Sequence, residues 1–254
     1  MEMTIAARKK DLVKEVFENP RRYFGGRQYD VKIRTETVKS LAAGLQYRRV
    51  LDIGCGDGSI SLPLVGPQTS FTLLDLSENM LSAARANVPR EFAGNVEILH
   101  QDFMTASLCP ESFDLIICIG VMAHMVAPEE FVGRIAALLK QGGSLIIEFT
   151  DAFSLAGRTS RFFRALRELI APARYPVNLF SYAQAFQLVN RYGLQLISQF
   201  RYGLPALPGL RLLSHKMRYK IVRTINGTCK KNRNTWWGEE YICLLTLDRT
   251  RGSE

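Results

Sequence analysis

The sequence lacks several features that would place it in a specialised class of protein. Its five cysteines are odd in number, scattered, and never spaced as C-x-x-C, which argues against a disulfide framework or a zinc site. No stretch approaches ~18 uninterrupted apolar residues, so no transmembrane helix is predicted. The first ten residues have no apolar core after their charges, which argues against a signal peptide. We therefore expect reduced thiols and a cytoplasmic location.

Acidic residues are scarce in the second part of the chain. Residues 1–151 carry 16 Lys+Arg against 19 Asp+Glu, a net charge of −3, whereas residues 152–254 carry 17 against 5, a net charge of +12. Such a basic region suits a phosphate-bearing substrate, an anionic membrane surface or nucleic acid, although a solvated basic surface would look the same. Over residues 210–225, Leu, Ile and Met alternate with Arg and Lys, which favours a helix lying at a membrane surface and a peripheral location.

The composition indicates a single globular domain. Of the 254 residues, 47% are hydrophobic and 22% charged, which suits a sizeable core. The periodicity divides residues 1–254 into three parts: an N-terminal helical cap (1–45), a core (46–150) and a part containing insertions (151–238). Apolar spacing predicts cap helices over residues 3–18 and 31–45, with a loop at 21–30 between them.

A strand followed by a glycine turn opens the core. The apolar run Val50–Ile53 predicts a buried strand, glycines follow at 54, 56 and 58, and residues 60–65 have a helical apolar pattern. Strand, glycine turn and helix together begin a nucleotide-binding βαβ unit. The dinucleotide fingerprint G-x-G-x-x-G would need a third glycine where Ser59 stands, and this counts against a nicotinamide cofactor.

Two motifs in order give the core a family resemblance. The pattern Asp52-x-Gly54-x-Gly56-x-Gly58 resembles the first motif of class I S-adenosylmethionine-dependent methyltransferases, and residues 74–81 closely match the second. The resemblance covers roughly residues 31–150. It implies a Rossmann-like α/β fold, with a seven-stranded sheet that is parallel except for an antiparallel last strand and with helices on both faces. It also implies S-adenosylmethionine as the cofactor.

The candidate cofactor residues follow from the motifs. Asp75 ends the second predicted strand, 23 positions beyond Asp52, where a carboxylate can accept hydrogen bonds from both ribose hydroxyls. The resemblance implies that Asp102 meets the adenine amino group and that Phe103 covers the adenine ring, although Phe103 could equally be core. Tyr29 could reach the cofactor from the cap, or pack against the second helix. The predicted cofactor contacts are Tyr29, Asp52, Gly54, Gly56, Asp75, Leu76, Met80, Asp102, Phe103 and Ile119.

The rest of the chain alternates strands with helices. Continuously apolar residues 113–120 predict a central strand. The other predicted strands are 71–75, 96–100, 144–149, 194–202 and 241–248, and the predicted helices are 78–87, 128–139, 160–171 and 182–192. We expect the acceptor pocket in 151–180 and 203–238, since the family often builds it from such segments.

Methyl transfer to oxygen needs a base for the acceptor proton, and the chain has three histidines. His124 follows the central strand, near the expected methyl group, and is our candidate base, although it could be structural. His100 and His215 are weaker candidates. No Asn/Asp-Pro-Pro-aromatic sequence follows that strand, which disfavours amino-group acceptors of bases or glutamine. No acidic cluster suggests magnesium, so no metal is predicted.

The sequence therefore predicts a methyltransferase acting on a small molecule, preferably at oxygen, such as a sugar, polyketide, quinone or lipid-like intermediate. Two alternatives stay open. An RNA-modifying methyltransferase would use the basic part of the chain, although nucleic acid is the less favoured partner. A non-catalytic protein that binds S-adenosylmethionine and acts on a partner would share every cofactor motif. The sequence identifies neither the acceptor nor the oligomeric state.

Overall fold

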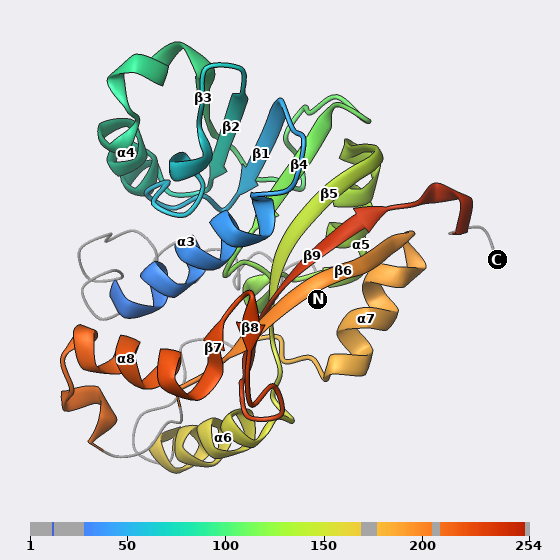
Figure 1. The fold of residues 1–254 in the computed structure, drawn as a ribbon. Coiled ribbons are helices and arrows are strands. Elements are labelled where there is room, and N and C mark those ends of the chain that lie inside the picture. Colours follow the sequence, from blue (N-terminus) through green and yellow to red (C-terminus); the bar gives the residue numbers. More distant parts are fainter. Residues whose placement is uncertain (1–11, 13–27, 169–176, 205–208, 252–254) are drawn as a thin grey trace.

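The computed structural model describes residues 12, 28–168, 177–204 and 209–251. The predicted helix 3–18 and most of the loop 21–30 lie outside these ranges. Within them, seven strands form one sheet in the order β3-β2-β1-β4-β5-β9-β6 (Figure 1). The strands are β1 (Arg49–Ile53), β2 (Ser70–Asp75), β3 (Val96–His100), β4 (Phe113–Cys118), β5 (Leu139–Thr150), β6 (Leu194–Tyr202) and β9 (Glu240–Leu247).

The predicted Rossmann-like sheet is confirmed. Strands β1 to β5 pair in parallel, whereas β9 is antiparallel to both of its neighbours, β5 and β6. The last strand is therefore the antiparallel one, as the resemblance implies. Strand β4 lies between β1 and β5 and is buried along almost all of its length, as its continuous apolar run predicts.

Helices cover both faces of the sheet (Figure 1). One face packs against α3 (Gln28–Ala42), α4 (Glu78–Asn87) and α8 (His215–Asn226), through residues such as Ile33, Leu81 and Val222. The opposite face packs against α5 (Pro128–Leu138) and α7 (Tyr182–Arg191), through residues such as Phe131 and Val189. A further helix, α6 (Leu155–Glu168), and a short hairpin of β7 (Gly227–Thr228) and β8 (Lys231–Asn232) lie beyond the sheet.

Two predicted elements in the core differ from the structure. The helical pattern at residues 60–65 forms only a short 3-10 turn, Leu62–Leu64, because Pro63 lies inside it and Gly66-Pro67 follows. Strand β5 begins at Leu139 rather than at residue 144. Leu139 pairs with Phe113 before the register shifts, so the glycines at 142 and 143 lie within the strand instead of before it.

Three predicted helices begin at other residues. Helix α3 starts at Gln28, inside the predicted loop, and ends at Ala42. Helix α6 starts at Leu155, five residues early, because Ser154 caps its first turn: Ser154 Oγ accepts the Gly157 N–H at 3.0 Å. The stretch 210–225 is not one helix: Leu210–Leu212 form a separate 3-10 turn, and α8 begins after the N-cap Ser214.

The surface of the described residues includes exposed apolar side chains on α6 and on the 212–217 segment, but none of the described helices has the length and apolar character needed to cross a bilayer.

Candidate functional site

The chain leaves β1 toward β2 on one side of the sheet, and β4 lies on the other side of β1. Ligands of open α/β sheets bind at such a switch point, beyond the carboxyl ends of the strands. Gly54 and Gly120 follow β1 and β4, both with positive φ (+67° and +76°). A Cβ on Gly54 would come within 2.5 Å of Val121 Cγ2, so the Val121 side chain packs against the loop as only glycine allows. We call the region beyond the carboxyl ends of β1 and β4 the crevice, by analogy with such sheets, and take it as the candidate cofactor site.

The glycine loop is held in one conformation by backbone hydrogen bonds. The N–H groups of Gly54 and Cys55 both donate to the carbonyl of Leu74, at 2.8 and 3.1 Å. Gly56 and Gly58 also have positive φ, and a Cβ on Gly58 would meet Leu62 at 2.6 Å. Each glycine therefore serves the turn itself, and the resulting backbone cradle without side chains fits a cofactor that lies against the loop.

Asp75 joins the glycine loop to the next strand. Its Oδ2 accepts the Gly56 N–H at 2.9 Å, and its Oδ1 accepts the Ser77 N–H at 2.9 Å. A carboxylate has about four lone-pair sites, so each oxygen keeps capacity for a ribose hydroxyl. Burial raises the pKa of this carboxyl, while the N–H groups of Ser77 and Gly56 oppose that rise. The arrangement is compatible with the ribose contact of Asp75, which stays a prediction.

Asp52 lies beneath the loop rather than open to the crevice. It is 3% exposed, and its Oδ2 accepts a hydrogen bond from Ser61 Oγ at 2.5 Å. Burial raises the pKa of Asp52 to about 7, with a further contribution from the Asp75 charge. Asp52 and Ser61 therefore brace the turn from within. Sequence reasoning missed Ser61, although its position nine residues after Asp52 places it in the same turn.

Leu76 and Met80 support the loop from the start of α4. The Ser77 side chain caps this helix by accepting the Met80 N–H at 3.3 Å, as the sequence predicts. The Met80 side chain is buried in the core, and Leu76 is half-buried. His100 Nε2 lies 3.0 Å from the Leu76 carbonyl, and its other ring nitrogen lies 3.3 Å from Glu78 Oε2. His100 is therefore part of the surface of the turn.

Asp102 and Phe103 form the turn after β3. Asp102 Oδ1 accepts the Met104 N–H at 3.0 Å. The Phe103 side chain is 4% exposed, with its ring 4.9 Å from that of Phe131 and the Arg134 guanidinium 5.4 Å from its centroid. The ring thus lies in the core on the α5 side, and its contact with an adenine ring stays a prediction.

His124 ends a short 3-10 turn, Met122–His124, after β4. Its side chain is half-buried, on the segment that leaves the crevice, while Ile119 is buried toward α3. Asn178, which sequence reasoning missed, ties this turn to the segment before α7. Its side-chain amide donates to the carbonyls of Met122 and Met125, and its backbone N–H donates to that of Ala123. These hydrogen bonds fix residues 122–125 beyond the carboxyl end of β4.

Tyr29 packs against α8. Its ring lies 6.4 Å from the His215 ring in a stacked arrangement, and the Arg218 guanidinium lies 5.0 Å from its centroid. Burial raises the pKa of Tyr29 to about 12, and the Asp30 charge adds to this rise. Tyr29 and His215 therefore hold α3 to α8, and the cofactor contact proposed for Tyr29 stays a prediction.

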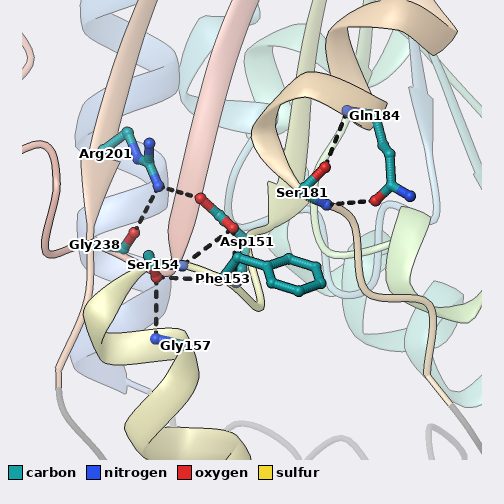
Figure 2. Close-up of polar contacts among 8 residues, drawn as sticks. All are labelled: Asp151, Phe153, Ser154, Gly157, Ser181, Gln184, Arg201 and Gly238. Carbon is teal, nitrogen blue, oxygen red and sulfur yellow. Dashed lines mark hydrogen bonds and ion pairs between the residues drawn. The ribbon is translucent and has the colours of Figure 1, made fainter.

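A second polar region lies beyond the carboxyl end of β5 (Figure 2). Asp151 Oδ2 pairs with Arg201 at 2.5 Å, and the same guanidinium donates to the Gly238 carbonyl at 3.1 Å. It lies 5.4 Å from the ring centroids of both Tyr182 and Tyr241. Figure 2 also shows Asp151 just before α6, where its other oxygen accepts the N–H groups of Phe153 and Ser154, and Ser154 caps the helix. Charged and aromatic groups thus meet beside Asp151 and Gly238, which border the two segments where the acceptor pocket is expected.

The cysteines and acids give no sign of a metal centre in the described part of the chain. The five cysteines are unbridged thiols, three of them buried. Across the described ranges, no group of three or more His, Cys, Asp or Glu side chains is placed to hold a metal ion.

Comparison with known proteins relates the sequence of this chain to methyltransferases. Residues 46–187 match the family model described as a methyltransferase domain. The ubiquinone biosynthesis O-methyltransferase of Bordetella avium is 32% identical over 114 residues, 44% of this chain and 46% of that protein. Its counterpart in Coxiella burnetii is 30% identical over 135 residues, 53% of each chain. The chain thus spans about half the length of the curated relatives it matches.

Solved structures resemble nearly the whole chain. Magnesium protoporphyrin IX methyltransferase from Synechocystis, with bound S-adenosylhomocysteine, has a TM-score of 0.64 at 16% identity, covering 94% of this chain and 100% of that one. A methyltransferase from Thermotoga maritima, described as dependent on S-adenosylmethionine, has a TM-score of 0.62 at 20% identity, covering 89% and 93%. At such identities the likeness shows the fold alone.

Proposed function

The chain belongs to the S-adenosylmethionine-dependent methyltransferase family, and from that premise we propose that it transfers the methyl group of S-adenosylmethionine to an oxygen of a small molecule. The observation that carries this proposal is the meeting of the Gly54–Gly56 turn and the Asp75 carboxylate at the switch point of the sheet. The glycine backbone suits the amino-acid part of the cofactor, and Asp75 suits its ribose.

The cofactor supplies a methyl group on a good leaving group, so the protein must align the acceptor and remove its proton. Alignment of two reactants can be worth ~7–11 kcal/mol. In our proposal Gly54, Gly56 and Asp75 hold the cofactor, with Leu76, Met80 and Asp52 behind them. Asp102 and Phe103 border the adenine, and Ile119 borders the methionine part. His124 takes the acceptor proton on a ring nitrogen, because its turn lies at the exit of β4.

We propose that the acceptor is bound by residues of 151–180 and 203–238, next to the side chains of Asp151, Arg201, Tyr182 and Tyr241. Aromatic rings and a guanidinium suit a planar, oxygen-bearing acceptor. The two relatives named above act in ubiquinone biosynthesis by their names, and this favours a phenolic or quinone-type acceptor among the small molecules considered.

Exposed side chains on the basic part of the chain support a second candidate property, attachment to an anionic membrane surface. Phe153, Phe162 and Trp236 are 59%, 66% and 63% exposed. They belong to one region, because the Ala156 N–H at the start of α6 donates to the Trp237 carbonyl at 3.1 Å. Exposed aromatic rings within a region of high positive charge suit a lipid–water interface. A lipid-like acceptor would then lie close to the protein's active site.

The experiment that tests the proposed activity is transfer of labelled methyl from S-adenosylmethionine to a panel of phenols, catechols, sugars and transfer RNA. Label on a phenolic oxygen, detected by mass spectrometry, is the expected result. Label on RNA alone would favour the RNA-modifying alternative, and cofactor binding without transfer to any acceptor would favour the non-catalytic one.

A further inference from the structure

A buried polar cluster joins α3 to three strands beside the cofactor crevice. We call it the Arg34 cluster, and its members are Asp30 and Arg34 of α3, Glu148 of β5, Tyr202 of β6 and Glu240 of β9. The side chains of Arg34, Asp30 and Glu148 are 9%, 16% and 2% exposed. Sequence reasoning selected none of these residues.

Arg34 is the one cation within the cluster, and it makes contacts to two carboxylates. Its Nε donates to Glu148 Oε1 at 2.9 Å, and a terminal nitrogen lies 2.9 Å from Glu148 Oε2. The other terminal nitrogen lies 3.3 Å from Asp30 Oδ2. Arg34 thus contacts both oxygens of Glu148, through one hydrogen bond and one ion-pair contact, and its contact with Asp30 is longer. Glu148 is therefore the carboxylate that the guanidinium neutralises best.

The contacts of the Tyr202 hydroxyl indicate that one of the neighbouring carboxyl groups carries a proton. Its oxygen lies 2.9 Å from Asp30 Oδ1 and 3.0 Å from Glu148 Oε1. A phenol has a single O–H and can donate to only one of these oxygens. The other contact becomes a hydrogen bond only when a carboxyl group carries a proton and donates it to Tyr202.

The charge balance of the cluster agrees with this proton. Asp30, Glu148 and Glu240 would together carry three negative charges against the single charge of Arg34. Glu240 accepts a hydrogen bond from Thr150 Oγ1 at 2.9 Å and lies opposite Tyr202 in the sheet register. Burial raises the pKa values of Glu148 and Glu240, and repulsion between the acids adds to the rise, while Arg34 opposes it. Burying several like charges together is costly unless some are neutralised by protons.

The cluster adjoins the cofactor crevice. A Cβ on Gly120, at the end of β4, would lie 3.8 Å from a terminal nitrogen of Arg34 and 3.9 Å from Glu148 Oε2. Helix α3 also reaches the glycine loop, since Thr35 Oγ1 lies 3.2 Å from the Ser59 carbonyl, as well as 2.9 Å from the carbonyl of Val31 in its own helix. A charged group bound over Gly120 would therefore lie close to the buried side chains of Arg34 and Glu148. Electrostatic interactions are strong between groups so little exposed to water.

We propose that the Arg34 cluster holds a proton in the cofactor-free protein and releases it when the positively charged sulfonium of S-adenosylmethionine binds. The inference rests on the proposed function. S-adenosylhomocysteine has a neutral sulfur and otherwise the same charged groups, so it leaves the proton in place. The cluster therefore favours the substrate cofactor over its product, and this preference grows as the pH rises through the range where the proton is held.

Among the described residues, the titratable and charged groups that face this proton lie on α3 and on or next to the strands β5, β6 and β9. They are Asp30, Tyr29 and Arg34 on α3, Glu148 on β5, Tyr202 on β6, and Glu239 and Glu240 at the start of β9. Burial raises the pKa of Tyr202 well above its usual range, as do the charges of Asp30 and Glu148, so its hydroxyl keeps its proton. The released proton therefore comes from a carboxyl group.

The test is calorimetric titration of the wild-type protein with S-adenosylmethionine and with S-adenosylhomocysteine, each in two buffers of different ionisation enthalpy. We expect proton release with the former and less with the latter. The ratio of their affinities should rise with pH, by at most about tenfold per pH unit for one proton. Binding of both ligands with equal proton release and a pH-independent ratio would overturn the inference and leave the proposed function intact. Failure of S-adenosylhomocysteine to bind at all would instead overturn the proposed function.

Substitutions locate the proton. Asp30→Asn and Glu148→Gln each change one of the two carboxyl groups that Tyr202 contacts, and at least one of them should abolish most of the difference in proton release between the two ligands. Glu129→Gln, an exposed acid on α5 at the opposite face of the sheet, is the control and should leave the difference unchanged. An unchanged difference in a folded Asp30→Asn and a folded Glu148→Gln variant would contradict the assignment to this cluster.

Discussion

At the scale of single residues, burial decides which carboxylates can serve the ligand. Asp75 lies at the crevice with hydrogen-bonding capacity left on both oxygens, whereas Asp52, one motif earlier, is enclosed and bonded to Ser61. The two acids look alike in the sequence because each ends a strand. Asp52 is 3% exposed and so braces the loop from within, whereas the cofactor contact of Asp75 stays our proposal.

The pKa of Asp52 leads to a prediction about stability. Burial raises this pKa to about 7 in the folded protein, against about 4 in an unfolded chain. The folded state therefore holds the proton more tightly, and stability present below the unfolded pKa is lost as the pH rises toward the folded pKa. Asp52→Asn should remove this loss, because the amide oxygen can still accept from Ser61.

The measurement is thermal unfolding of both proteins across that pH range. We expect the variant to gain melting temperature relative to the wild type as the pH rises from about 4 to about 7, the window set by the two pKa values. A difference between the two proteins that stays constant across the window would contradict the assignment.

His124 carries the prediction about catalysis. If its imidazole removes the acceptor proton, His124→Gln should lower kcat by about 10²–10⁴-fold, the usual contribution of a general base. The affinity for S-adenosylhomocysteine should change little, since the residue lies on the exit from β4 rather than on the glycine loop. His100→Gln is the control, because His100 bonds only to the turn at Leu76 and Glu78. A kcat that falls equally in both variants would show that His124 is structural.

At the scale of elements, the strands and capped helices could be predicted closely, and the segments fixed by distant partners could not. Residues 194–202 and 78–87 match β6 and α4 in full because period, length and the Ser77 cap agree locally. Helix α6 starts early because Ser154 caps it, in a turn that is held by Asp151, which Arg201 binds from 50 positions away. Likewise, Arg34 and Glu148 are 114 positions apart, and no local pattern marks them as partners.

The turn before α6 provides a test of the interaction between Asp151 and Arg201. Asp151→Ala removes the acceptor for the N–H groups of Phe153 and Ser154 and leaves the Arg201 guanidinium without its carboxylate. We expect a loss of about 3–5 kcal/mol in the free energy of unfolding, measured in urea, because breaking a buried ion pair leaves one charge uncompensated. Ser181→Ala, which removes an exposed capping box on α7, should cost only about 1 kcal/mol. Equal losses would contradict the role given to Arg201.

At the scale of the whole molecule, the positively charged part of the chain and the cofactor motifs belong to different parts of the sheet. The motif-bearing core lies in the part with a net charge of −3, and the helices beyond β5 lie in the part with a net charge of +12. In Figure 1, α6 and α8 occupy the same end of the molecule, away from β1 to β3. The fold and the cofactor loop could be predicted from motifs of consecutive residues. The acceptor region could not, because it is assembled from segments without a shared motif.

This separation leads to a prediction about membranes. The protein should co-sediment with vesicles rich in phosphatidylglycerol and much less with phosphatidylcholine vesicles, and added salt should weaken the binding. Phe162→Glu combined with Trp236→Glu should reduce it strongly. Val126→Glu, at an exposed apolar residue before α5, is the control and should bind as the wild type does. Binding that ignores lipid charge, or that the paired substitution leaves unchanged, would remove the membrane proposal.

The central claim is that the crevice between β1 and β4 binds S-adenosylmethionine through the glycine loop and Asp75. The most direct test is calorimetric titration with S-adenosylhomocysteine and, separately, with NADH. We predict binding of the former alone, and a fall in its affinity of about 10-fold or more in Asp75→Asn, since a hydrogen bond to a charged group is worth about 1.5–3 kcal/mol. Asp114 lies at the amino end of β4, where its carboxylate accepts the N–H groups of Arg48 and Arg49. Asp114→Asn should therefore leave the affinity unchanged. No binding of S-adenosylhomocysteine, or a preference for NADH, would contradict the account.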